Sequence, residues 1–139
     1  QENDYQGLAE NELNIVSKNR PSQEQRQSLV FAWKVLKHVK SNAILIAHKQ
    51  QTVGVGTGQV SRIDAVDLAI KKTNPGIIHE AVLASDAFFP FRDSIDAIAA
   101  SGIKIIIQPS GAMREKEIIE ACDEHGIVLI LADKRSFNH

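Results

Sequence analysis

The sequence has a single cysteine, a single methionine and few aromatic residues, which make up 5% of the chain. Cys122 cannot form an internal disulfide, and no second thiol is available to build a metal or redox pair with it. We therefore expect a reduced, cytoplasmic protein in which Cys122 is a small buried hydrophobic residue. Four histidines lack the spacing of metal ligands, so we expect no metal site; they are His38, His48, His79 and His125.

The chain also lacks an excess of either charge and any long apolar run. Lys and Arg total 16 against 17 Asp and Glu, so the formal net charge of −1 disfavours binding to nucleic acid or to an anionic membrane. No apolar run approaches the roughly 18–20 residues that span a bilayer. The polar first residues lack the basic and apolar regions of a signal peptide, and the chain begins with Gln, so we expect a soluble piece of a longer polypeptide.

The apolar content is nevertheless large enough for one folded domain. The chain has 139 residues, of which 43% are hydrophobic. Residues 1–20 are polar and rich in Asn and Glu, and we interpret them as a lead-in or linker stump that is ordered only by docking elsewhere. The pattern changes at Pro21, so we place the domain at residues 21–139.

Beyond Pro21, short apolar runs alternate with segments of helical periodicity. The spacing predicts helices at 22–39, 61–73, 93–101 and 113–125, and strands at 43–47, 52–56, 81–84, 104–107 and 127–131. The first two strands are so close that they must form an antiparallel hairpin. The later alternation predicts parallel βαβ units, so we expect an α/β fold: a three-layer α/β/α sandwich around a mixed five-stranded sheet with one antiparallel hairpin.

Local signals set the ends of these predicted helices. Ser22 with Gln25, and Ser61 with Asp64, have the spacing of capping boxes at helix starts. Gly102 and Gly126 follow the last periodic residues of two helices, where glycine commonly ends a helix. The glycines of residues 54–58 mark places where another backbone or a ligand comes close.

Three loops follow predicted strands, at the sheet edge where α/β proteins bind ligands. Residues 54–62 are rich in glycine and lead into a helix, which suits an anion; however, they contain neither a P-loop lysine nor a dinucleotide fingerprint, and a loosened hairpin explains them as well. Residues 85–93 hold three of the five phenylalanines together with Asp86, Arg92 and Asp93. A core aromatic cluster explains one or two rings, whereas the charges suit a planar heterocycle that is stacked and oriented. Residues 108–112 fit either a third ligand loop or a tight turn.

Five segments together carry a family resemblance: residues 40–44, 53–62, 85–93, 108–111 and 135–139. In this order they resemble the C-terminal end of the bifunctional purine-biosynthesis enzymes that join an AICAR formyltransferase to an IMP cyclohydrolase. The resemblance runs from about Arg20 to His139, and the string Ser-Asp-Ala-Phe-Phe-Pro-Phe-Arg-Asp at 85–93 is highly specific.

The resemblance implies transfer of a formyl group from 10-formyltetrahydrofolate to the 5-amino group of AICAR, followed by ring closure to IMP. It implies that residues 21–139 are the second of two cytidine-deaminase-like subdomains, without the zinc signature of the deaminases. Active sites in this family form across a homodimer. The implied partners are therefore the AICAR nucleotide, the folate, a second copy and the N-terminal part of the same enzyme.

The resemblance also implies roles for individual positions. Asn42, Arg62 and Arg135 match residues that contact the AICAR nucleotide, and Phe88 matches a ring that stacks near its base. Four positions match the lining of the folate site, with the aspartate suited to anchor the pterin; they are Ile63, Asp93, Ala112 and Met113.

Two features of the family do not transfer to this chain. The proton-transferring Lys-His pair lies in the first subdomain, so we assign no catalytic residue here; Lys37-His38 has the same letters in a different, helical context. The family also binds a monovalent cation, but Val39 and Ala43 stand where hydroxyl residues often occur, leaving only backbone oxygens with Asp86. The resemblance predicts a binding part that is inactive alone; a nucleotide- or folate-binding module without catalysis and a scaffold subunit are the alternatives.

Overall fold

A single sheet organises the part of the chain that the computed structural model describes, residues 14–39 and 41–132. Its six strands lie in the order β1-β6-β5-β4-β2-β3. The strands are β1 (Asn14–Ile15), β2 (Ile44–His48), β3 (Gln51–Gly56), β4 (Val82–Ser85), β5 (Ile105–Pro109) and β6 (Val128–Ala132). The helices are α1 (Gln23–Leu36), α2 (Arg62–Lys72), α3 (Arg92–Ser101) and α4 (Glu115–His125), with a short 3-10 helix, η3, at Ile78–Glu80.

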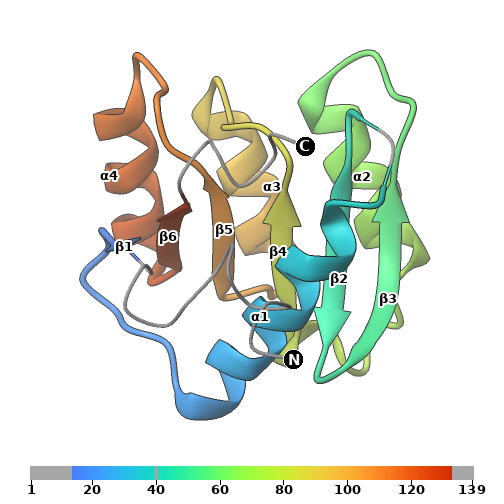
Figure 1. Ribbon diagram of the computed structural model, residues 1–139. Helices are drawn as coiled ribbons and strands as arrows, with labels where there is room; N and C mark the ends of the chain where they lie inside the picture. The colour runs from blue at the N-terminus through green and yellow to red at the C-terminus, as the bar shows by residue number, and fades with distance from the viewer. Residues whose placement is uncertain (1–13, 40, 133–139) are drawn as a thin grey trace.

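Helices cover both faces of the sheet, so the predicted three-layer α/β/α sandwich is confirmed (Figure 1). On one face, α1 buries Leu29, Trp33 and Leu36 in a core that includes Ile107 of β5. On the other face, α2, α3 and α4 pack over a second core that includes Ile106, the neighbouring residue of the same strand. The alternation of these two isoleucines shows that β5 is buried on both sides, as its continuous apolar run predicts. None of the helices described here has the length and apolarity needed to span a bilayer.

The directions of the strands decide which loops meet. β2 is antiparallel to both of its neighbours, β3 and β4, whereas β4, β5 and β6 are parallel to one another. Consequently β3, β4, β5 and β6 all point the same way. The loops after β3, β4 and β5 therefore leave the same edge of the sheet, and the residues before β2 enter at that edge.

The sheet has six strands, one more than the five predicted. The sixth strand, β1, lies within the lead-in and pairs antiparallel with β6, with Asn14 opposite Leu131. The lead-in is held further by Ser17, whose hydroxyl accepts a hydrogen bond from the Leu129 amide at 2.8 Å. Two residues are too few to show a period of two, so the strand is invisible in the sequence pattern. Residues 1–13 of the predicted lead-in lie outside the described chain.

The helix ends follow the predicted signals closely. At Ser22 both bonds of a capping box are present: the hydroxyl accepts from the Gln25 amide, and the Gln25 side chain accepts from the Ser22 amide. At Ser61 the structure shows only the bond from the Asp64 amide to the hydroxyl. Gly102 and Gly126 have φ values of 101° and 71°, in the left-handed region where glycine costs least.

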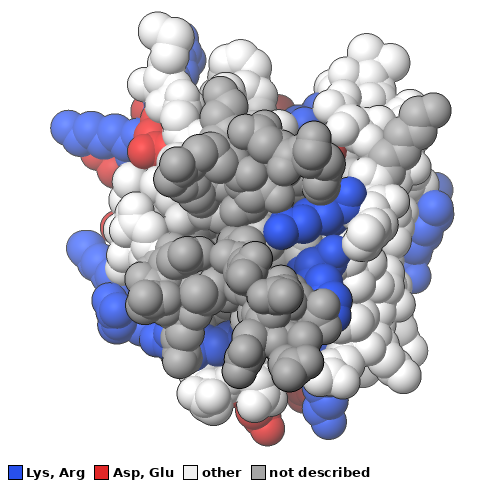
Figure 2. All heavy atoms as spheres, viewed as in Figure 1, with Lys and Arg blue, Asp and Glu red and all other residues white. Residues whose placement is uncertain are grey.

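Charged side chains of both signs lie on the face that α1 covers. Figure 2 shows Lys and Arg side chains near the middle of the view and also at its left, right and lower margins, with Asp and Glu side chains at the upper left and at the bottom. This mixture of signs agrees with the net charge of −1.

The glycines of β3 allow α2 to lie against the sheet. A Cβ atom at Gly56 would meet the Ala65 carbonyl oxygen at 2.1 Å, and one at Gly54 would meet the Ala69 carbonyl oxygen at 2.5 Å. Both obstacles are helix backbone, which cannot swing aside as a long side chain can. The close approach expected at these glycines is therefore made by α2.

We predict that Gly56→Ala lowers the free energy of unfolding by about 2 kcal/mol or more, because α2 would have to move away from β3. Gly76→Ala is the matched control: its nearest contact is the flexible Asn74 side chain at 3.2 Å, and we expect a change of less than about 1 kcal/mol. Urea unfolding followed by circular dichroism measures both. Equal midpoints for the two variants would contradict the argument.

Candidate functional site

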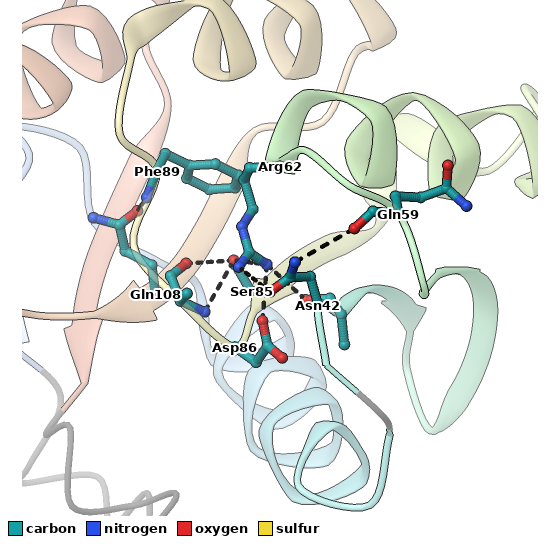
Figure 3. Close-up of polar contacts among 9 residues, drawn as sticks. Asn42, Gln59, Arg62, Ser85, Asp86, Phe89 and Gln108 are labelled. Carbon is teal, nitrogen blue, oxygen red and sulfur yellow. Dashed lines mark hydrogen bonds and ion pairs between the residues drawn. The ribbon is translucent and has the colours of Figure 1, made fainter.

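A polar cluster lies at the sheet edge where the loops after β3 and β4 and the segment before β2 converge (Figure 3). Asn42 comes just before β2, Arg62 is the first residue of α2, and Asp86 directly follows β4. These residues are up to 44 positions apart in sequence. The antiparallel placement of β2 between β3 and β4 brings them together.

The Arg62 guanidinium connects all three segments. Its Nη1 donates to Asp86 Oδ1 at 2.8 Å and lies 3.4 Å from the Ala43 carbonyl oxygen and 3.5 Å from Ser85 Oγ. Its Nη2 donates to Asn42 Oδ1 at 3.2 Å. The Asn42 amide group in turn donates to the Gln59 carbonyl oxygen at 3.4 Å, which ties in the loop after β3.

The ion pair between Arg62 and Asp86 is largely shielded from water. The two side chains are only 10% and 9% exposed. Shielding strengthens their attraction, but it also makes the loss of either partner costly, because the other charge would remain almost buried. Nε–H and the second N–H of Nη2 have no partner among the described residues, so Arg62 keeps two donors for a ligand.

The three phenylalanines of the loop after β4 have different surroundings. Phe89 is fully buried in the core beneath α2, α3 and α4, which confirms the core interpretation for one ring. Phe88 is half-buried. Phe91 is exposed, and the Arg114 guanidinium lies 5.8 Å from its ring centre. Two rings therefore remain available at the surface.

The charged residues of that loop do not form one group. Asp86 pairs with Arg62, whereas Arg92 pairs with Asp96 at 3.1 Å and with Glu124 at 2.9 Å on the outer surface of α3 and α4. Hydrogen bonds from Arg92 lower the pKa of both of these carboxyl groups. Asp93 is exposed, and its carboxylate accepts from the Ser94 amide at 2.8 Å. The expectation that Asp86, Arg92 and Asp93 face one ligand is therefore not met for Arg92.

The positions that match the folate site lie in the first turns of α2 and α3 and in the turn before α4. Ile63 and Ala112 are half-buried, and Met113 is fully exposed. The Gly111 amide donates to Glu115 at 3.1 Å, which holds the turn that precedes α4. Arg135, the remaining nucleotide-binding candidate, lies outside the described residues.

The groups considered for a monovalent cation are engaged within the protein. The Ala43 carbonyl oxygen accepts from the Asp86 amide at 3.2 Å and lies within 3.4 Å of Arg62 Nη1. The Asp86 carboxylate is paired with Arg62. Among the described residues, no cluster of three His, Cys, Asp or Glu side chains could hold a metal ion.

Sequence reasoning missed one buried polar side chain, Gln108. It is 0% exposed at the end of β5, and its Oε1 accepts from the Phe89 amide at 3.0 Å. Its Nε2 has no hydrogen-bond partner among the residues that the structure describes. The signal in the sequence is a single polar residue that continues an otherwise apolar strand. Cys122, by contrast, is buried as expected, and burial raises the pKa of its thiol to about 12, which leaves it unreactive.

Comparison with known proteins places these loops in context. The sequence profile of the AICARFT/IMPCHase bienzyme family matches residues 1–72. The chain is 51% identical over 129 residues to the bifunctional purine biosynthesis protein PurH of Aquifex aeolicus (strain VF5), which covers 91% of this chain and 26% of that protein. It is 49% identical over 131 residues to the PurH protein of Persephonella marina (strain DSM 14350 / EX-H1), covering 93% of this chain and 25% of the relative.

A third relative extends the match to almost the whole chain. The PurH protein of Xanthomonas axonopodis pv. citri (strain 306) is 48% identical over 138 residues, covering 98% of this chain and 26% of its own length. The chain thus spans about a quarter of the length of these relatives.

We predict that Asp86→Ala lowers the free energy of unfolding by about 3 kcal/mol, because Arg62 would keep an almost buried charge without its partner. The double variant Arg62→Met/Asp86→Leu should recover most of that loss, since it leaves no buried charge. Asp67→Ala, at an exposed position of α2, is the control and should change stability by no more than about 0.5 kcal/mol. Denaturant unfolding of the four proteins tests this, and a double variant less stable than Asp86→Ala would refute it.

Proposed function

Because this chain belongs to the AICARFT/IMPCHase bienzyme family, we propose that residues 21–139 supply substrate- and folate-binding residues for formyl transfer to AICAR. The reaction takes the formyl group from 10-formyltetrahydrofolate in de novo purine biosynthesis. The observation that supports this best is the Arg62 cluster. It joins three loops at one sheet edge, in a chain about half identical to PurH proteins.

In this proposal the nucleotide lies over the loops after β3 and β4. Arg62 and Asn42 orient it by directional hydrogen bonds, and Phe88 stacks on its base. The shielded pair with Asp86 supports such a role, because it fixes the guanidinium plane while leaving Nε–H and one Nη2 hydrogen for the ligand. Arg135 would add a further contact to the nucleotide.

The folate would lie beside the nucleotide, toward the start of α3 and α4. Asp93 is exposed at the start of α3, where its carboxylate can accept hydrogen bonds from a pterin. Ile63, Ala112 and Met113 offer apolar contact, and the full exposure of Met113 suits a side chain that a ligand covers.

The chemistry explains why orientation matters in this reaction. The AICAR amine is a poor nucleophile, because its lone pair is delocalised into the imidazole carboxamide. Its nitrogen attacks the formyl carbon, the bond from that carbon to N10 of the folate breaks, the amine loses a proton and N10 gains one. Catalysis therefore needs alignment of the amine, a proton acceptor and stabilisation of the formyl oxyanion.

We assign alignment to this chain. The proton-transferring residues and the cyclohydrolase would belong to the remaining three quarters of a PurH-length protein, and the complete site would form across a homodimer. On this basis the 139-residue chain binds the nucleotide but does not transfer the formyl group.

We predict that the chain binds AICAR nucleotide in calorimetry and that Phe88→Ala weakens binding about tenfold, equivalent to about 1.4 kcal/mol. Phe31→Ala removes a half-buried ring from α1, which covers the face of the sheet opposite to α2 and α3. This variant is the matched control and should leave the affinity for AICAR nucleotide unchanged. Absence of binding by the unmodified chain would overturn the proposal. Tetrahydrofolate production from AICAR and 10-formyltetrahydrofolate by this chain alone would overturn the division of labour.

A further inference from the structure

Gln108 is an unusual residue for its position. It continues the apolar run of β5, is 0% exposed and pairs in the sheet with Leu131. A buried amide N–H group without an acceptor costs free energy, and the Nε2 of Gln108 has no acceptor in the described part of the chain. A side chain of similar length without polar atoms would avoid this cost, so the amide needs a physical explanation.

The oxygen atom of the same amide group supplies an explanation. Gln108 Oε1 accepts from the Phe89 backbone N–H at 3.0 Å, and this contact is buried (Figure 3). The Phe89 ring fills the core on the same side of the sheet. β5 is thereby tied to the loop that follows β4, across 19 residues of sequence.

The same loop is anchored on the other side of Phe88. The Asp86 amide donates to the Ala43 carbonyl oxygen at 3.2 Å, and its carboxylate is held by Arg62. The Ala87 amide donates to Ser85 Oγ at 3.4 Å. Phe88 therefore lies between two fixed backbone groups, one held from β2 and α2 and the other held from β5.

We propose that Gln108 is a positioning residue for nucleotide binding: by fixing the Phe89 amide it sets where the Phe88 ring stands. This inference rests on the function proposed above, because it assigns Gln108 to the same pocket. Gln108 itself touches no ligand in this scheme. Its effect passes through the backbone of the loop.

The experiment compares three variants of the 139-residue chain with the unmodified protein. Gln108→Met keeps the length of the side chain and removes the acceptor for the Phe89 amide. Gln108→Glu keeps an acceptor oxygen at the same reach. Ile106→Val, two residues earlier on the same face of β5, perturbs the same core without removing a hydrogen bond to the loop and is the control.

We expect Gln108→Met to weaken AICAR nucleotide binding about fivefold to tenfold in calorimetry. Ile106→Val should leave affinity unchanged even where it lowers the melting temperature, and Gln108→Glu should stay within about threefold of the unmodified chain. Unchanged affinity in Gln108→Met, or an equal loss in Ile106→Val, would overturn the proposal.

Amide hydrogen exchange separates this inference from the function on which it rests. In Gln108→Met the amides of residues 86–89 and 91 should exchange at least tenfold faster, while those of β5 stay protected. If the unmodified chain binds no nucleotide, the proposed function fails, and the exchange result still decides whether Gln108 fixes the loop. Unchanged exchange at Phe89 would refute the positioning role outright.

Discussion

The candidate site depends on one topological constraint: β2 runs antiparallel between β3 and β4. Three parallel strands in these places would put the residue before β2 at the far edge of the sheet. With β2 reversed, Asn42 enters beside the ends of β3 and β4, and Arg62 can reach it across the gap between the loops. The buried glycines of β3 complete the arrangement, because they let α2 lie close enough to aim its first residue at β4.

The electrostatics of the site are those of a local pair rather than of a charged surface. Arg62 is matched by Asp86 at 2.8 Å, so the cluster adds little net charge to a chain whose total is −1. Recognition by such a site rests on the direction of the remaining donors and on aromatic contact. This differs from the long-range attraction that a basic surface exerts on a polyanion.

Most of the fold could be predicted because periodicity and helix caps are local properties. The capping box at Ser22 and the glycines at 102 and 126 set helix ends through residues that lie next to those ends in the sequence. The two-residue strand β1 could not be predicted, since its pairing with β6 depends on residues more than 110 positions away. The loops that form the site could be located from the sequence, but the ion-pair partners of their side chains could not. The local sequence does not show which charged residues of the loop after β4 face the site. Asp86 pairs with Arg62 there, whereas Arg92 pairs with Asp96 and Glu124 on the outer surface.

Two costly polar groups lie on either side of the loop after β4. Gln108 is a buried amide with an unpaired donor, and Arg62 with Asp86 is an almost buried ion pair. Each is costlier than an apolar replacement of the same volume would be. They hold the loop after β4 from its two sides. A sequence that accepts polar burial on both sides of one loop specifies the conformation of that loop more tightly than stability alone requires.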